Sequence, residues 1–286
     1  MSVDLLQEKI RKLKNPSMVS FALDVSQVPP QLIRQEQAPV EAWTSYALGL
    51  LDALRGLVPA VRFCMGSFAL HGKAGMDALE RCVERAGELG FYVAVDGPEL
   101  TSAPMAKLAA EALTNAQGWH AMVIGVYPGS DVVKPFVNVC KSGKAVFCVA
   151  RTGNKSAPEL QDLLTGSRLV HTAAADMVNR YGETILGRYG YSQLGVLLGA
   201  AGGSSIKSLR PKYPTQFFLI DGYDWTGANA KNCSYGFDKL GHGAVACAAE
   251  SVTAAWKEAP EEEPYAAAVA AAERMKRALT RYVTVL

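Results

Sequence analysis

The feature that most constrains the fold is a regular alternation of apolar, strand-like runs with amphipathic helical stretches along the 286 residues of the chain. Short apolar runs bounded by turn residues are typical of buried strands, and apolar residues at three- to four-residue spacing are typical of helices. Eight runs are predicted as strands: 18–25, 60–65, 91–96, 121–126, 144–150, 194–199, 216–220 and 243–247. Helices are predicted at 40–57, 75–89, 105–116, 157–164, 172–186, 206–209 and 261–286.

This alternation predicts an α/β fold with a parallel sheet. Strands that alternate with helices indicate right-handed crossovers, and eight such units close naturally into a (β/α)8 barrel, the TIM barrel. The usual size of that fold, about 250 residues, fits one domain over residues 1–286. An open, doubly wound sheet is the alternative, but no G-x-G-x-x-G motif follows the first strand to support a dinucleotide site.

Composition and charge exclude several classes of function. Apolar residues make up 49% of the chain and charged residues 20%, and the formal net charge is +2. These values are typical of a globular protein and predict no nucleic-acid partner. No apolar run approaches the roughly 20 residues that span a bilayer, so no membrane partner is predicted. The first residues lack a signal-peptide pattern, so a cytoplasmic location is expected.

The six cysteines predict neither a disulfide framework nor a metal site. No two of them form a C-x-x-C pair, and no Cys and His stand at zinc-ligand spacing. Buried free thiols are therefore expected. No metal and no cofactor is predicted.

Two aspartates stand where predicted strands end. Asp96 ends the run FYVAVD, and Asp24 lies near the end of the first strand. In a β/α barrel the carboxyl ends of the strands face the active-site mouth, so both carboxylates are candidate functional residues. A structural alternative stays open, in which they cap loops or form a buried ion pair with Arg62.

Ordered segments along most of the chain resemble the orotidine 5'-phosphate decarboxylases of the second bacterial type. The best match is YPGSDVVKPF at 127–136, and GKAVFCVARTGN at 143–154 resembles the family's fifth strand and its T-S-N loop, with Gly153 in place of the serine. Further matches are FALDVS at 21–26, VRFCMGSFALHG at 61–72, Gln161-Asp162, LGVLLGA at 194–200 and the final helix after Trp256-Lys257.

The resemblance implies a barrel that converts orotidine 5'-phosphate to UMP and CO2 in pyrimidine synthesis. In that family a D-x-K-x-x-D motif after the third strand supplies a proton-donating lysine between carboxylates. Here Asp96 matches the first Asp, Pro98 stands at the lysine position and Thr101 at the second Asp position. Asp24 matches a family active-site Asp, and Arg62 stands at a second-strand lysine position. Arg62 cannot replace the proton donor, because the pKa of arginine lies above about 12.

The positions that hold phosphate in the family differ as well. A Gln after the seventh strand and an Arg after the eighth correspond here to Thr226 and Glu250, with Asp221 and Asp224 close by in the sequence. A like-charge pair about 4 Å apart opposes binding by roughly 4 kcal/mol at an effective dielectric near 20. The resemblance places these residues at the ligand: Tyr127, Thr152, Asn154, Asp221, Thr226, Gly227 and Glu250.

Three residues near these positions also have purely structural interpretations. Tyr127 either reaches the ligand or orders the loop after the fourth strand, and Asp131 stands where a helix N-cap is expected. Trp225 is either a lid over a ligand or a surface packing residue.

Three hypotheses about function follow. The chain is a family decarboxylase whose lysine is replaced in a way the sequence does not show, or a weak or silent relative that binds another small molecule, a nucleotide or a partner. Because the family dimerises across its barrel mouths, a homodimer or a heteromer with a paralogue is implied. The third hypothesis is a remodelled mouth suited to a cationic ligand or a hard metal ion. Its lining is Asp24, Arg62, Asp96, Glu99, Asp221, Asp224 and Glu250.

Overall fold

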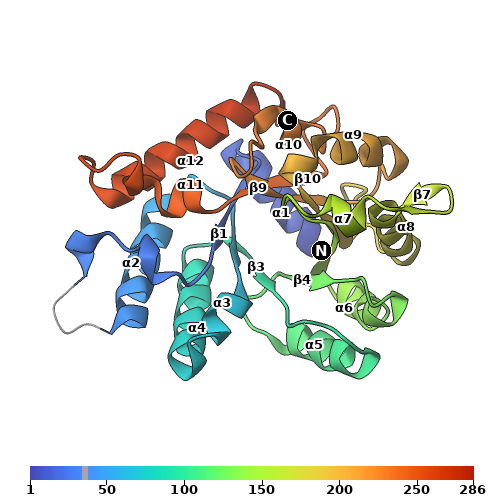
Figure 1. Ribbon diagram of the computed structural model, residues 1–286, viewed down its shortest axis with the longest axis horizontal. Helices are drawn as coiled ribbons and strands as arrows, with labels where there is room; N and C mark the ends of the chain where they lie inside the picture. The colour runs from blue at the N-terminus through green and yellow to red at the C-terminus, as the bar shows by residue number, and fades with distance from the viewer. Residues whose placement is uncertain (34–37) are drawn as a thin grey trace.

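Eight parallel strands form a closed barrel in the computed structural model, which describes residues 1–33 and 38–286 (Figure 1). Neighbouring strands follow the order β1, β10, β9, β8, β5, β4, β3 and β2, and β2 closes the ring against β1. The prediction of a (β/α)8 barrel is confirmed. The strands are β1 (Ser17–Phe21), β2 (Ala60–Phe63), β3 (Tyr92–Asp96), β4 (Ala121–Gly125), β5 (Ala145–Arg151), β8 (Leu194–Gly199), β9 (Phe218–Tyr223) and β10 (Ala244–Ala248).

The first strand is shorter than predicted. β1 ends at Phe21 rather than at residue 25, and the chain then forms a 3-10 turn, Val25–Gln27. The Asp24 carboxylate caps this turn by accepting a hydrogen bond from the Ser26 N–H at 2.9 Å. A short polar side chain that bonds to backbone two residues ahead competes with the sheet ladder, which explains the early end.

The seventh barrel strand is longer than predicted. β9 continues to Tyr223 rather than ending at residue 220, and Asp221 pairs in register with Cys247 of β10 and Gly199 of β8. Asp221 therefore stands in the barrel wall rather than in the following loop. This difference decides what lies at the centre of the mouth.

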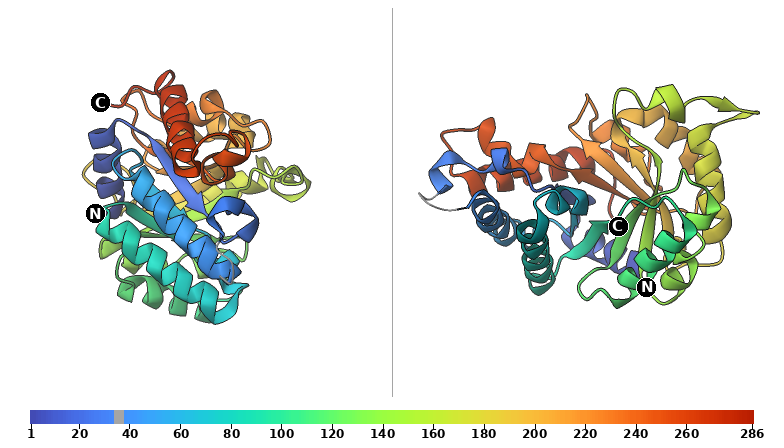
Figure 2. Two further views of the ribbon diagram at one scale, coloured as in Figure 1. Left: turned by 90° about the vertical axis from the view of Figure 1, so that its left-hand side faces the viewer. Right: turned by 60° about the horizontal axis from the view of Figure 1, so that its bottom comes forward.

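Helices cover the outside of the barrel, where their apolar faces pack on strands that are buried on both sides. α2 packs between α4 and α12, and Figure 2 shows the three side by side. The helices are α1 (Ser2–Leu13), α2 (Pro39–Leu54), α3 (Met65–Ala69), α4 (Gly72–Glu88), α5 (Ala103–Asn115), α6 (Phe136–Lys141), α7 (Pro158–Gln161), α8 (Val170–Gly182), α9 (Gly203–Lys212), α10 (Ala230–Ser234), α11 (Glu250–Thr253) and α12 (Pro264–Thr280).

Some helix predictions differ from the structure. The helix predicted at 157–164 is wrong beyond its first turn, because α7 ends at Gln161 and a two-stranded hairpin follows, β6 (Leu164–Thr165) and β7 (Arg168–Leu169). Gly166, with φ 64°, makes the turn of this hairpin possible. The helix α6 was not predicted. Asp131 is not an N-cap, since it lies inside a 3-10 turn, Ser130–Val132.

The final helix is shorter than predicted, since α12 begins at Pro264 rather than at residue 261 and ends at Thr280 rather than at residue 286. The Glu263 carboxylate accepts a hydrogen bond from the Ala266 N–H at 2.9 Å, which caps α12 at the end of the acidic run. All six cysteines are free thiols, and all but Cys64 are buried. Within residues 1–33 and 38–286, no helix is both long enough and apolar enough to cross a membrane.

Candidate active site

The centre of the barrel mouth is an ion cluster around Arg62, near the end of β2. Its guanidinium makes a two-pronged contact with the Asp96 carboxylate, from Nε at 2.6 Å and Nη2 at 2.9 Å. Its Nη1 donates to Asp221 Oδ1 at 2.8 Å. Arg62 itself is buried, whereas Asp96 and Asp221 keep part of their surface exposed toward the mouth. Three strands, β2, β3 and β9, thus contribute one side chain each.

This arrangement fixes the charge of Arg62. Burial alone lowers the pKa of a guanidinium, but the attraction of Asp221 and Asp96 outweighs it and raises the pKa of Arg62 well above its ordinary value. The guanidinium is therefore a permanent cation whose N–H groups donate to carboxylates. It cannot give a proton to a reacting carbon.

Asp24 is not part of this cluster. The sequence left open whether Arg62 pairs with Asp24 or with Asp96. The structure pairs it with Asp96, and also with Asp221, which was not expected. The Asp24 carboxylate is used by the turn that follows β1. Of the two candidate aspartates, one thus forms the ion pair and the other the loop cap.

A cavity of about 570 Å³ opens above Arg62. It lies at the carboxyl ends of the strands, where β/α barrels bind their ligands. Ser20 and Cys64 lie in its floor beside Arg62, with their side chains 3.3 Å apart, and burial raises the pKa of the Cys64 thiol to about 11. The charged lining residues are Arg62, Asp221, Asp224, Glu250, Lys257 and Glu258.

The cavity is electronegative, since those lining residues bring four carboxylates against two cations. Burial and the nearby Glu258 raise the pKa of Asp224, although Arg274 opposes the shift. Like charges this close make the ionised form of Asp224 costly. A dianionic group entering the cavity meets the same unfavourable field.

Glu250 is held in place at the cavity wall. The Gln27 side chain donates to Glu250 Oε1 at 3.4 Å and accepts from the Thr253 hydroxyl at 3.0 Å. The Trp256 indole donates to the Gln27 carbonyl at 2.8 Å. The residue at the family's arginine position is thus a carboxylate with a supporting network.

The loop after β9 forms the lip of the cavity. Asp224 and Thr226 both have positive φ, 61° and 52°, a conformation that non-glycine residues adopt at a cost. The Trp225 ring lies over Gly153 and Gly222, and a Cβ on either glycine would stand 3.5 or 3.3 Å from it. Trp225 also lines the cavity, which favours its interpretation as a lid over packing elsewhere.

Five other predicted residues stand outside the cavity lining. Thr226 donates weakly to the Gly153 carbonyl at 3.3 Å, and Gly227 lines a neighbouring cavity of about 400 Å³. Tyr127 donates its hydroxyl to the Ala150 carbonyl at 2.8 Å, and burial raises the pKa of its phenol to about 12. These contacts order the loops of the mouth.

Thr152 and Asn154 are tied to each other and to α7. The Thr152 hydroxyl donates to Asn154 Oδ1 at 2.5 Å, and the Thr152 N–H donates to Gln161 Oε1 at 2.8 Å. Beneath them, Arg151 makes a two-pronged ion pair with Asp162 at 2.9 and 2.8 Å. The Gln161-Asp162 pair therefore serves the loop after β5.

The loop after β3 carries no cation. Pro98 lies partly buried in it without a donor, and Thr101 and Glu99 are exposed. Lys107 is also exposed on α5, as expected from its place in the helix. Within the described part of the chain, no three His, Cys, Asp or Glu side chains lie together as a metal ion requires.

Among the lining residues that were not predicted from the sequence, three carry titratable side chains of interest, Cys64, Lys257 and Glu258. Lys257 and Glu258 come from the segment after α11, and Cys64 follows β2. The only available signal was their position just after a predicted strand or short helix on the mouth side of the barrel. Lys257 is the one lysine among the described lining residues.

Comparisons with known proteins identify relatives of this chain. No protein-family model matches the chain. The orotidine 5'-phosphate decarboxylase of Rhodopirellula baltica is 28% identical over 260 residues, covering 86% of each chain. That of Clostridium acetobutylicum is 25% identical over 260 residues, covering 90% of each. The chain is a relative of the orotidine 5'-phosphate decarboxylases.

Solved structures show the same barrel. The OMP decarboxylase of Leishmania donovani superposes with a TM-score of 0.77 at 21% identity, covering 98% of both chains. The Plasmodium berghei orotidine 5'-monophosphate decarboxylase superposes with a TM-score of 0.79 at 11% identity, covering 98% of this chain and 99% of the other. At such low identities these likenesses establish the fold alone.

Proposed function

We propose that this decarboxylase relative turns over orotidine 5'-phosphate weakly or not at all, and that its mouth excludes a phosphate dianion. The observation that carries the proposal is the Arg62 cluster: the buried cation at the centre of the mouth is bound to Asp96 and Asp221 and has no proton to give. Pro98 supplies no replacement.

The phosphate side of the mouth supports the same conclusion. Glu250 lies where the resemblance places an arginine, and Asp221, Asp224 and Glu258 line the same cavity. The field of these carboxylates favours a small organic cation over a nucleotide. A cationic small-molecule ligand is therefore the ligand class that we propose.

Titration with UMP tests the proposed exclusion of phosphate. A ligand that binds only the native state raises the melting temperature, so about 5 mM UMP is expected to leave that of the purified chain unchanged. Glu250→Arg, which reverses the charge at the cavity wall, is expected to produce a UMP-dependent increase. Stabilisation of the unaltered chain by micromolar UMP would contradict the proposal.

Decarboxylation through a different lysine is the second candidate. The likeness to decarboxylases over most of the chain favours the family reaction, and Lys257 is a cation at the cavity wall. If the chain forms UMP and Lys257→Met abolishes that activity while leaving the melting temperature unchanged, this candidate replaces the first.

The assembly that we propose is a dimer, either of two copies or with a paralogue. The support is the resemblance to a family that pairs across its barrel mouths. Sedimentation equilibrium of the purified chain distinguishes a self-associated dimer of twice the 30.6 kDa chain mass from a monomer awaiting a paralogue.

A further inference from the structure

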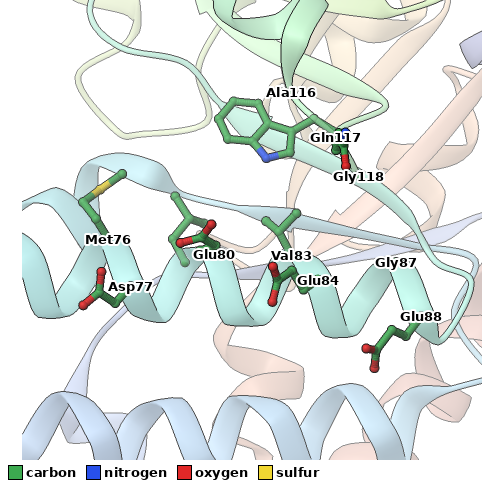
Figure 3. A pocket seen from close by; sticks show the side chains of 12 residues that line it. Met76, Asp77, Glu80, Val83, Glu84, Gly87, Glu88, Ala116, Gln117 and Gly118 are labelled. Carbon is green, nitrogen blue, oxygen red and sulfur yellow. The ribbon is translucent and has the colours of Figure 1, made fainter.

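A long groove on the outer wall of the barrel shares no lining residue with the mouth cavity described above. It has a volume of about 910 Å³ and runs along α4 from Met76 to Glu88, with the loop 116–119 as its opposite wall (Figure 3). α4 packs closely on α2 at its other side, whereas no comparable packing joins it to α5. The groove lies in this gap between neighbouring helices of the outer layer.

The charges of α4 are sorted between its two sides. Arg81 and Arg85 turn to α2, where they form ion pairs with Glu41 at 2.6 Å and Asp52 at 2.5 Å. The groove side instead carries Asp77, Glu80 and Glu84, whose side chains are exposed and line the groove. None of these three acids has an ion-pair partner among residues 1–33 and 38–286.

The opposite wall is apolar and preformed. Trp119 lines the groove, and Met76, which is 40% exposed, lies at one end of it in Figure 3. The Lys144 ammonium donates to the carbonyls of Ala116 and Trp119 at 2.9 and 2.6 Å, which anchors the loop. Gly118, with φ 78°, lets the loop turn toward Val83.

We propose that this groove binds a cationic amphipathic helix of a partner protein. Asp77, Glu80 and Glu84 follow one another at three- and four-residue spacing, so they form one acidic stripe along α4. The apolar face of the partner helix packs on Met76 and Trp119, and its Lys or Arg side chains meet the stripe. The distance from Met76 to Glu88 along α4 corresponds to a partner segment of about 12 residues, or three turns.

A second copy of this chain does not fit the groove as well. One cationic amphipathic helix of this chain is α1, with Arg11 and Lys12 in its last turn. The apolar face of α1, formed by Val3, Leu6 and Ile10, is fully buried in its own barrel. A helix from another protein therefore matches the groove better, and the proposal is independent of what the mouth binds.

The test uses a synthetic, end-blocked 14-residue peptide of Leu, Ala and Lys, with its lysines at three- and four-residue spacing. Isothermal titration calorimetry compares the whole chain with the variant Asp77→Asn/Glu80→Gln/Glu84→Gln. The matched control, Glu159→Gln/Glu261→Gln/Glu262→Gln, removes three exposed carboxylates elsewhere and changes the net charge equally. Met76→Ser tests the apolar contact.

The peptide is expected to bind the unaltered chain and the control. Its affinity for the groove variant is expected to be roughly tenfold lower. Its affinity is also expected to be lower for Met76→Ser and to weaken as salt is added. A peptide with Glu in place of every Lys is expected not to bind. The proposal is overturned if the unaltered chain does not bind the cationic peptide at low salt. It is equally overturned if the groove variant binds normally, or if the control loses as much affinity as the groove variant.

Discussion

Arg62 shows how one buried side chain decides the chemistry of a cavity. A guanidinium has a fixed fork of donors, and here two carboxylates from different strands occupy that fork. The cluster closes the floor of the mouth and leaves one net negative charge there. Arg62 therefore does not neutralise the carboxylates on the cavity walls. The negative charge of the cavity follows from the contact of Arg62 with Asp96 and Asp221.

Removing Arg62 is expected to destabilise the fold, because Asp96 and Asp221 then repel each other without a cation. For Arg62→Leu we expect the free energy of unfolding to fall by about 2 kcal/mol, less than for a fully buried pair because both carboxylates are partly exposed. Urea denaturation at pH 7 measures this change in the free energy of unfolding. Adding Asp96→Asn and Asp221→Asn is expected to restore part of the loss, and a single variant as stable as the unaltered chain would contradict the account.

Asp224 is expected to make stability fall as pH rises. Its pKa is raised in the folded protein by burial and by Glu258, so the folded state holds the proton more tightly than the unfolded state. The stabilisation is complete below the ordinary aspartate pKa of about 4 and is lost as pH rises through the raised value. Asp224→Asn is therefore expected to be more stable than the unaltered chain at pH 7 and to lose that advantage near pH 3, as followed by thermal melts.

At the scale of elements, His120 joins α1, β3 and β4. The Val93 N–H donates to its Nδ1 at 3.0 Å, its ring stacks on Tyr92, and its carbonyl accepts from the Ser2 hydroxyl at 2.7 Å. Burial, with Lys9 and Lys144 nearby, lowers the pKa of its imidazole to about 4. The neutral ring is thus the form that this junction requires.

Acid is expected to weaken this junction. A histidine whose pKa is lowered on folding contributes stability that is complete above its unfolded pKa of about 6.5 and is lost as pH falls toward 4. Between pH 7 and pH 4 the free energy of unfolding of the unaltered chain is expected to fall by about 2 kcal/mol more than that of His120→Asn, once the partial exposure of the ring is allowed for. Urea denaturation across this range checks it, and parallel pH profiles for the two proteins would refute it.

The elements were predictable to different degrees. Strand and helix alternation predicts the barrel because strands buried on both faces need continuous apolar runs. The pairing of Arg62 with Asp96 was among the predicted alternatives, but its second partner was not predictable, because Asp221 interrupts an apolar run and looks like the start of a loop. In the barrel it stays on β9 because Arg62 neutralises it from inside. The hairpin after α7 was missed because the region has no short-range strand pattern.

For the whole molecule, the family resemblance indicates the fold, whereas the geometry of the mouth indicates the chemistry. The resemblance correctly indicated the barrel, since a fold tolerates wide substitution when its apolar pattern is kept. It did not show which carboxylate Arg62 would bind, nor that Lys257 lines the cavity. Function resides in those contacts rather than in the fold.

The most direct test of the central claim is decarboxylation of orotidine 5'-phosphate by the purified chain, followed by the formation of UMP. The account predicts little or no UMP above the uncatalysed background, because the buried cation at the centre of the mouth, Arg62, holds its proton permanently. Turnover by the unaltered chain that disappears in Asp96→Ala would contradict the account and would show that the chain is an active decarboxylase.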